Sequence, residues 1–124
     1  ELSKADIIVL CCPLTPETKG LIDSKALSAM KSSAYLINVA RGGCVIEEDL
    51  VKALKNGDIA AAGIDVTDPE PLPSSSNLWG IENVILTPHT GGETRLYEDN
   101  VLDILIENIE RLERGKVDLL NQII

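Results

Sequence analysis

Four stretches of mostly apolar residues divide the chain, at residues 5–12, 34–39, 59–66 and 83–87. Each is shorter than an ordinary helix and lacks the regular alternation of a strand with one solvated face. A continuous apolar run of this length is typical of a β-strand that is buried on both faces, as strands in parallel sheets are. The pattern therefore predicts four strands of a parallel sheet.

Segments with helical spacing separate these strands. Asp23 or Ser24 can cap a short helix that continues through Met30. Between residues 47 and 55, apolar residues recur at helical spacing, acidic residues come first and lysines come late. Asn56-Gly57 then provides a stop signal, because glycine readily adopts the left-handed conformation that ends helices. Strands that alternate with helices predict an α/β fold, with a parallel sheet and helices on both faces.

The last predicted element is a long helix from about Gly92 to Arg114. Its apolar residues recur every three or four positions, at Val101, Leu102, Leu105, Ile109 and Leu112. Acidic residues near its start and basic residues near its end agree with the helix dipole. The remaining acidic side chains are expected to form a solvated face.

Size and charge restrict the function classes. The chain has 124 residues, which is the size of one domain or part of one. Its 11 basic and 20 acidic residues give a net charge of −9, which repels nucleic-acid phosphates and anionic lipid surfaces. No stretch approaches the length of about 18 apolar residues that a membrane-spanning helix needs. We therefore expect neither a nucleic-acid partner nor a membrane.

The three cysteines, Cys11, Cys12 and Cys44, form an odd set in which two members are adjacent. Such a set does not suggest a disulfide framework, so a reducing cytoplasm is the expected location. Together with the single histidine it also makes a poor tetrahedral ligand set, and no metal site is predicted.

Polar or reactive residues follow each predicted strand: Cys12-Pro13, Arg41-Gly42-Gly43, Asp65 with Glu70, and His89. In parallel α/β sheets, ligands bind where the carboxyl ends of the strands meet. A histidine beside a carboxylate can transfer protons, and arginine binds carboxylates through paired hydrogen bonds. Each residue also has a structural alternative, as a solvated histidine, an exposed loop acid, a turn cap or an ion-pair partner. Together they predict an acid/base site that binds a carboxylate.

Four segments carry a resemblance to a known family. They are Cys12-Pro13-Leu14-Thr15-Pro16-Glu17-Thr18-Lys19-Gly20-Leu21-Ile22, Leu36-Ile37-Asn38-Val39-Ala40-Arg41-Gly42-Gly43, Gly63-Ile64-Asp65-Val66-Thr67-Asp68-Pro69-Glu70-Pro71-Leu72-Pro73 and Leu86-Thr87-Pro88-His89. In order and spacing they resemble the D-isomer-specific 2-hydroxyacid dehydrogenases, from Ala5 to about Lys116. The resemblance implies the second half of a Rossmann-type NAD(P)-binding domain, whose cofactor is NAD or NADP.

The resemblance also implies roles for individual residues. Arg41 resembles the arginine that binds the substrate carboxylate, His89 the acid/base, and Glu70 its hydrogen-bond partner. Asp65 matches the acid that binds the nicotinamide carboxamide. The positions that match the dinucleotide-binding surface are Cys12, Pro13, Val39, Ala40, Arg41, Asp65, His89, Gly91 and Gly92.

Two positions depart from the family pattern. Cys44 stands where the family often has Val or Ile, and Ile46 where it often has Asp. Both flank the Arg41 loop, and we expect them to affect packing more than chemistry. Cys44 is expected to be a buried, inert thiol, with a reactive thiol near Arg41 as the alternative.

The family's Gly-rich phosphate-binding turn and its substrate lobe have no counterpart in these 124 residues. We therefore interpret residues 1–116 as a partial dinucleotide-binding domain and 117–124 as a C-terminal tail of a longer, homodimeric protein. The isolated chain is expected to bind NAD weakly and to lack turnover. Its sheet edge is expected to promote dimerisation or aggregation.

The predicted function is hydride transfer between NAD(P)H and a small 2-keto or 2-hydroxy acid. The motif from Asp65 to Pro73 is most similar to that of glyoxylate/hydroxypyruvate reductases. The alternative is a dinucleotide-sensing, corepressor-like interaction protein of the same fold, because such proteins also keep the Arg, Glu and His residues. A third interpretation is a small, independently folding protein that neither transfers hydride nor senses dinucleotides.

Overall fold

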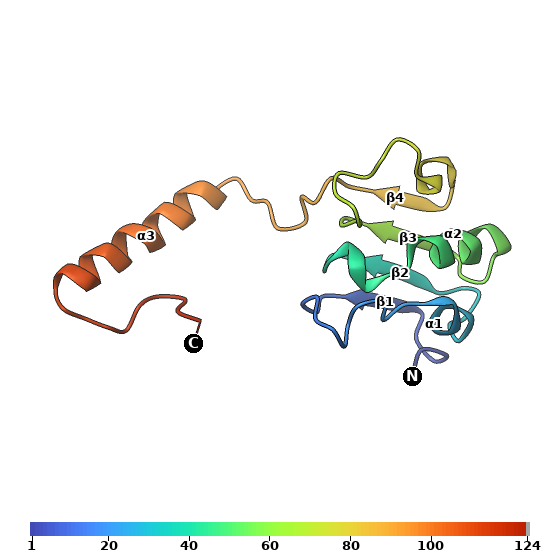
Figure 1. Cartoon of the computed structure of the whole chain (residues 1–124), viewed down its shortest axis with the longest axis horizontal. Coiled ribbons are helices and arrows are strands. Elements are labelled where there is room, and N and C mark those ends of the chain that lie inside the picture. The colour runs from blue at the N-terminus through green and yellow to red at the C-terminus, as the bar shows by residue number, and fades with distance from the viewer. Residues whose placement is uncertain (124) are drawn as a thin grey trace. The chain divides into compact units, whose positions relative to one another are not determined.

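The computed structural model describes residues 1–123, and the chain divides into two compact units, Glu1–Gly91 and Gly92–Ile124 (Figure 1). The first unit contains the strands β1 (Ile7–Leu10), β2 (Tyr35–Asn38), β3 (Ala61–Ile64) and β4 (Val84–Leu86). It also contains the α-helices α1 (Ser24–Ser28) and α2 (Glu47–Asn56) and the 3-10 helices η1 (Gly42–Cys44) and η2 (Asn77–Gly80). The second unit contains α3 (Tyr97–Glu113).

The four strands form one parallel sheet in the order β1-β2-β3-β4. Leu10 pairs with Asn38, Asn38 with Ile64, and Ile64 with Leu86. The register therefore aligns the carboxyl ends of all four strands at one edge of the sheet, where the loops to the following elements begin. The predicted α/β class with a parallel sheet is confirmed.

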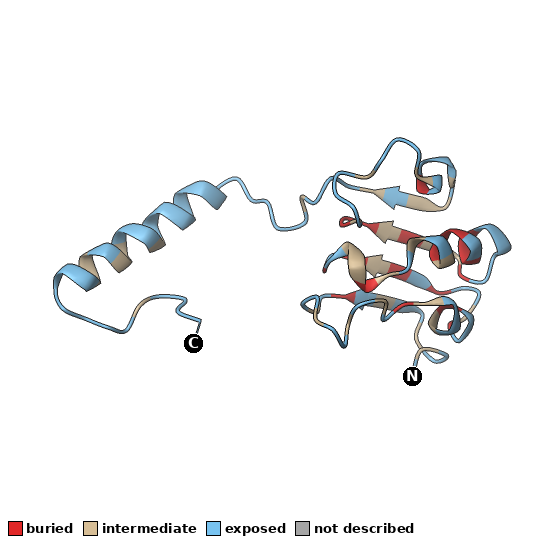
Figure 2. Cartoon of the chain, viewed as in Figure 1, coloured by how far each residue is buried: buried red, intermediate tan, exposed pale blue. Residues whose placement is uncertain are grey.

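The two faces of the sheet differ in burial (Figure 2). The face formed by Leu10, Leu36, Ala62 and Ile64 is buried in one core with residues of α1 and α2, among them Leu27, Leu50 and Leu54. Residues on the opposite face stay exposed: Ile7 at 60%, Val9 at 51%, Tyr35 at 51% and Ile85 at 72%. Strands buried on both faces, with helices on both sides, were expected. Within residues 1–91, α1 and α2 pack together on one face of the sheet, and helical cover of the opposite face stays a prediction.

Local sequence signals account for the helix ends in this unit. The carboxylate of Asp23 accepts a hydrogen bond from the amide of Ala26 at 2.8 Å and caps α1 as predicted. Helix α2 begins with Glu47, Glu48 and Asp49, and it ends at Gly57, which has φ 74° in the left-handed region. The strands are shorter than their apolar runs, because pairing stops where the loops diverge.

In the second unit, α3 begins at Tyr97 rather than near Gly92. Polar residues and two glycines occupy the preceding turn, and the acidic residues Glu98 and Asp99 stand in the first helical turn instead. Two pairs with i,i+4 spacing stabilise its last turns, Arg111 with Glu107 at 2.8 Å and Arg114 with Glu110 at 2.7 Å. No side chain of α3 is buried within the described residues.

The predicted domain boundary at residue 116 stays a prediction, and the last residue of the predicted tail lies outside the described residues. None of the helices that the structure describes combines the length and the apolar character needed to cross a membrane.

Candidate active site

The loop after β2 is held in place by the last residue of that strand. Asn38 is buried, and its side-chain oxygen accepts a hydrogen bond from the amide of Ala40 at 3.1 Å. Its amide nitrogen donates to the carbonyl of Arg41 at 3.0 Å. A buried Asn must satisfy both ends of its amide, and here it does so by fixing the backbone that carries the Arg41 side chain.

Gly42 brings the Arg41 loop into contact with the loop after β3. A Cβ atom on Gly42 would lie 2.0 Å from the carbonyl carbon and 2.2 Å from the carbonyl oxygen of Thr67. Only glycine permits this approach between two backbones. Gly42 therefore sets the spacing between the loop that carries Arg41 and the loop that carries Glu70.

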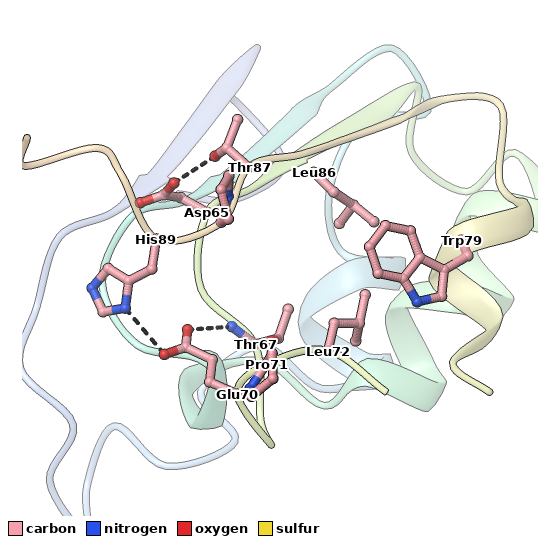
Figure 3. Close-up of a pocket in the computed structure, with 10 residues that line it drawn as sticks. Asp65, Thr67, Glu70, Pro71, Leu72, Trp79, Leu86, Thr87 and His89 are labelled. Atoms are coloured by element: carbon pink, nitrogen blue, oxygen red, sulfur yellow. Dashed lines mark hydrogen bonds and ion pairs between the residues drawn. The ribbon is translucent and has the colours of Figure 1, made fainter. Parts of the chain in front are cut away.

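The imidazole of His89 forms a hydrogen-bonded pair with Glu70 (Figure 3). His89 Nδ1 lies 3.0 Å from Glu70 Oε2, and Glu70 Oε1 accepts from the amide of Thr67 at 2.9 Å. With Glu70 ionised, the neutral imidazole donates from Nδ1, so its Nε2 is the free nitrogen. Nε2 has no hydrogen-bond partner among residues 1–123, so it is available to a ligand.

The charge of Glu70 is stabilised by its surroundings. The amide of Thr67, followed by the hydrogen bond from His89, lowers the pKa of Glu70 below its ordinary value. The positive charge of Arg41 lowers the pKa of Glu70 further, by a smaller amount. Glu70 is therefore a carboxylate at neutral pH, which is the form that accepts a hydrogen bond from the ring.

Asp65 is buried at the end of β3, with 7% of its surface exposed. Its Oδ1 accepts from the hydroxyl of Thr87 at 2.5 Å and from the amide of Thr90 at 2.9 Å, and its Oδ2 accepts from the amide of Gly91 at 2.9 Å. The hydroxyl of Thr87 is the largest cause that lowers the pKa of Asp65, and the amides of Gly91 and Thr90 add to it. Asp65 is thus a satisfied, buried carboxylate.

His89 has an unusual backbone conformation. Its φ is 57°, in the left-handed region that non-glycine residues seldom adopt. Its amide donates to the carbonyl of Asp65 at 2.8 Å, which ties the turn to the end of β3. Conformations of this kind cluster at functional sites, where neighbouring contacts hold them in place.

The predicted site residues gather around two pockets. One, of about 670 Å³, is lined by Asp65, Thr67, Glu70, Pro71, Leu72, Trp79, Leu86, Thr87, Pro88 and His89. In Figure 3 its apolar side chains Leu72, Trp79 and Leu86 stand on the far side of Glu70 from the His89 ring. The other, of about 500 Å³, is lined by Cys11, Cys12, Pro13, Leu14, Val39, Ala40 and Arg41.

Gly91 lies close to one lining residue of each pocket. A Cβ atom on it would lie 2.9 Å from Oδ2 of Asp65, in the first pocket, and 3.9 Å from the side chain of Val39, in the second. Gly92 belongs to the second unit and is not placed against the site. Arg41 donates from Nη1 to the carbonyl of Ala40 at 2.6 Å. The other two guanidinium nitrogens of Arg41 have no hydrogen-bond partner in the part of the chain that the structure describes.

Cys44 is fully buried, as expected, and burial together with the neighbouring Cys12 raises the pKa of its thiol. A raised pKa disfavours the reactive thiolate.

Three residues of the site were not singled out from the sequence: Thr67, Trp79 and Thr87. Thr67 holds Glu70 through its backbone amide, which no sequence pattern reveals. Trp79 donates from Nε1 to the carbonyl of Pro73 at 2.8 Å and forms part of the pocket wall. Thr87 lies beside Asp65 because the strand register pairs Ile64 with Leu86, and no sequence pattern reveals that register.

Comparisons with known proteins agree with this geometry. Residues 1–91 match the family model described as D-isomer specific 2-hydroxyacid dehydrogenase, NAD binding domain. The chain is 42% identical over 106 residues to the human glyoxylate reductase/hydroxypyruvate reductase, covering 86% of this chain and 32% of that protein.

Two solved structures are also similar. A D-isomer specific 2-hydroxyacid dehydrogenase from Xanthobacter autotrophicus, in complex with NADPH and MES, has a TM-score of 0.85 and 41% identity, over 99% of this chain and 50% of that chain. Another from Lactobacillus delbrueckii, in an NAD-complexed form, has a TM-score of 0.86 and 35% identity, over 94% of this chain and 39% of that chain.

The chain spans about a third of the length of the curated relatives that it matches. The relatives are dehydrogenases and reductases, so the comparisons do not favour the corepressor alternative. From the family match over residues 1–91 and the parallel α/β fold, this chain belongs to the D-isomer specific 2-hydroxyacid dehydrogenase family.

Proposed function

We propose that this chain supplies the acid/base group and part of the nicotinamide-binding surface of an NAD(P)-dependent reductase of small 2-keto acids. The observation that carries the proposal is the His89–Glu70 pair, in which Nδ1 is held at 3.0 Å by a carboxylate and Nε2 is left available. This arrangement fixes the orientation of the ring while a proton moves at the other nitrogen.

His89 is the proposed acid in the reducing direction. The nicotinamide, when bound, supplies the hydride that adds to the keto carbon of the substrate. The keto oxygen then needs a proton, and protonated His89 gives it from Nε2, which leaves a neutral ring. In the oxidising direction, neutral His89 removes the proton from the hydroxyl group. Glu70 does not touch the substrate and acts by holding the ring through Nδ1.

Arg41 is the proposed carboxylate-binding residue. Its guanidinium is always charged and has donors left over after the bond to the carbonyl of Ala40. Arginine binds carboxylates through two parallel hydrogen bonds, so it suits the carboxylate of a 2-keto acid. Asn38 and Gly42 support this role, because they determine where the Arg41 backbone lies.

The second pocket fits part of a dinucleotide. Cys12, Pro13, Val39 and Ala40 give it an apolar lining, and Arg41 closes one side with a positive charge. Asp65 Oδ1 already accepts two hydrogen bonds, whereas Oδ2 accepts one, from Gly91. Oδ2 therefore keeps one acceptor position for the amide of a nicotinamide ring. We include Asp65, His89, Gly91 and Gly92 in the proposed cofactor surface, with NAD and NADP both as candidates.

The relatives' names favour glyoxylate and hydroxypyruvate as the first substrates to test. A cytoplasmic location, a homodimeric parent protein and the absence of nucleic-acid and membrane partners complete the proposal. The net charge of −9 supports the last point.

The test is made on the longer parent protein that we expect to contain this chain. Oxidation of NADH and of NADPH is followed with glyoxylate, hydroxypyruvate and pyruvate, for the unchanged protein and for His89→Ala and Glu70→Gln. We expect His89→Ala to lower kcat by about 10³-fold and Glu70→Gln by about 10-fold or more, since positioned acids contribute about 10²- to 10⁴-fold.

Glu82→Gln is the matched control, because Glu82 lies beside β4 and outside both pockets of the site. It should leave kcat unchanged. An unchanged protein that binds NADH but reduces none of the three acids contradicts the proposal, as does full activity in His89→Ala.

A further inference from the structure

The turn that carries His89 is organised around a single residue. Residues 87–91 lie outside helices and strands, and four of their hydrogen-bond donors reach Asp65. The Thr87 hydroxyl and the Thr90 amide donate to Oδ1, the Gly91 amide donates to Oδ2, and the His89 amide donates to the backbone carbonyl. The conformation of the turn therefore depends on where the Asp65 carboxylate points.

Thr87 is the one side chain among these four donors. The other three are backbone amides, and they reach Asp65 only while the turn keeps its present conformation. Thr87 is itself anchored, because its amide donates to the carbonyl of Ile64 at 3.0 Å as a continuation of the pairing between β3 and β4. Its hydroxyl thus holds Oδ1 from a fixed point at the edge of the sheet.

The Asp65 carboxylate has little space in which to adopt a different orientation. Asp65 is 7% exposed, and a Cβ atom on Gly91 would lie 2.9 Å from Oδ2. A buried carboxylate that lost one donor would reorient toward another donor or toward water, because an unsatisfied buried charge is costly. Such a reorientation would release the amides of Thr90 and Gly91.

If the turn loses these hydrogen bonds, the backbone of His89 is expected to leave its left-handed conformation. Its φ of 57° is strained for a residue with a Cβ atom, and the contacts of its neighbours hold it there. A change at His89 would move its ring relative to Glu70, which is held separately by the amide of Thr67. The 3.0 Å contact between Nδ1 and Oε2 would then be lost.

We propose that Thr87 is a positioning residue for His89, acting through Asp65. The positioning of the His89 ring by Thr87 and Asp65 does not depend on any activity. Its effect on catalysis rests on the proposed function. Asp65 then has two roles, because the carboxylate that we include in the proposed cofactor surface also orders the turn that carries His89.

The experiment uses the 124-residue chain itself, in which His89 is the single histidine, so its ring nitrogens give unambiguous NMR signals. The variants are Thr87→Val, which keeps the shape and removes the hydroxyl, and Thr87→Ser, which restores it. Thr90→Val is the control, because the Thr90 hydroxyl forms no hydrogen bond within residues 1–123 while its amide does. Ring ¹⁵N shifts report which nitrogen of neutral His89 carries the proton, and the side-chain carboxyl ¹³C signal reports the titration of Asp65.

We expect Thr87→Val to lose the preference for the proton on Nδ1 and to raise the pKa of Asp65, since the Thr87 hydroxyl is the largest cause that lowers it. Thr87→Ser and Thr90→Val should keep both signatures. A folded Thr87→Val chain with an unchanged ring signature overturns the proposal, even if the titration of Asp65 moves. A general loss of structure is recognised because it would alter amide signals throughout the chain.

A second measurement needs no variant. In the unchanged chain the hydroxyl proton of Thr87 should exchange with water at least about 10-fold more slowly than that of Thr90, because it is hydrogen-bonded to a buried carboxylate. Equal exchange rates would contradict the proposal. In the parent protein, Thr87→Val should reduce kcat by about 10- to 100-fold with little change in KM, as misplacement of a reacting group does. If the unchanged parent has no reductase activity while the ring signatures hold, the proposed function fails and the positioning role stands.

Discussion

The two sides of the candidate site differ in how much of their chemistry the chain completes by itself. Beside β3 and β4, His89 is held by Glu70, Glu70 by Thr67, and the turn by Asp65. Beside β1 and β2, the Arg41 side chain donates only to a neighbouring carbonyl within the described residues, and the pocket next to it is open. An acid/base group needs a protein partner to orient it, whereas the partner of a carboxylate-binding arginine is the ligand itself.

The substitution with the largest expected effect is Gly42→Ala, because it acts on both sides at once. Its Cβ atom would lie 2.0 Å from the backbone of Thr67, so the loops that carry Arg41 and Glu70 must separate. We expect a loss of about 3 kcal/mol in the free energy of unfolding, at the upper end of the usual cost of overpacking. Urea denaturation followed by circular dichroism measures it.

Gly80→Ala is the control for this change, since nothing lies within 4 Å of the atom that it adds. It should alter the free energy of unfolding by less than about 0.5 kcal/mol. Equal effects of the two substitutions would show that the contact between the two loops does not stabilise the fold.

Asp65→Asn should have the next largest effect, and it acts on the His89 side alone. An Asn side chain keeps one oxygen acceptor where the carboxylate of Asp65 serves three donors. We expect a loss of about 2 kcal/mol in the free energy of unfolding, because a buried donor is left without a partner. Protection of the Thr90 and Gly91 amides from hydrogen exchange should fall, while the amides that pair β1 with β2 keep theirs. Uniform loss of protection would contradict this localisation.

Acid should destabilise the fold by protonating Asp65 and Glu70, which lie on the His89 side of the site. The pKa values of Asp65 and Glu70 are lowered in the folded state, so between the folded and unfolded pKa values the unfolded chain binds more protons. Their stabilising contribution is therefore complete above the unfolded values of about 4 and is lost as the pH falls through the folded values. Urea midpoints between about pH 6 and pH 2 should decline, and the decline should be shallower in Asp65→Asn. An equal slope in both proteins would exclude Asp65 as a contributor.

The smallest effect is expected at Cys44, beside the Arg41 loop. Cys44→Val replaces a buried thiol by an apolar side chain of similar size and should change the free energy of unfolding by less than about 1.5 kcal/mol. In the unchanged chain the exposed Cys11 should react first with a thiol reagent, and Cys44 should react only on unfolding, since burial raises its pKa. Rapid modification of Cys44 in the folded chain would favour the alternative of a reactive thiol near Arg41.

Much of the fold could be predicted, because the signals for its elements are local. The Asp23 cap, the stop at Gly57 and the four apolar runs depend on residues that are close in sequence. The start of α3 was missed by five residues, since Glu93 suits a helix start as well as Glu98 and Asp99 do. Within residues 1–91 one sheet face is left uncovered, and the predicted burial of that face stays a prediction. Apolar residues show that a face prefers to be covered, and they do not show whether this unit contains the helix to cover it.

The sequence by itself determined the class of the sheet, the order of its loops and the residue types at each strand end, because apolar runs and turn residues act over short distances. Only the tertiary structure decided that Glu70 reaches His89, that Thr87 reaches Asp65 and that Gly42 touches Thr67. These contacts join residues about 20 or more positions apart, and strand register and loop path set their distances. A sequence pattern records neither of these in advance.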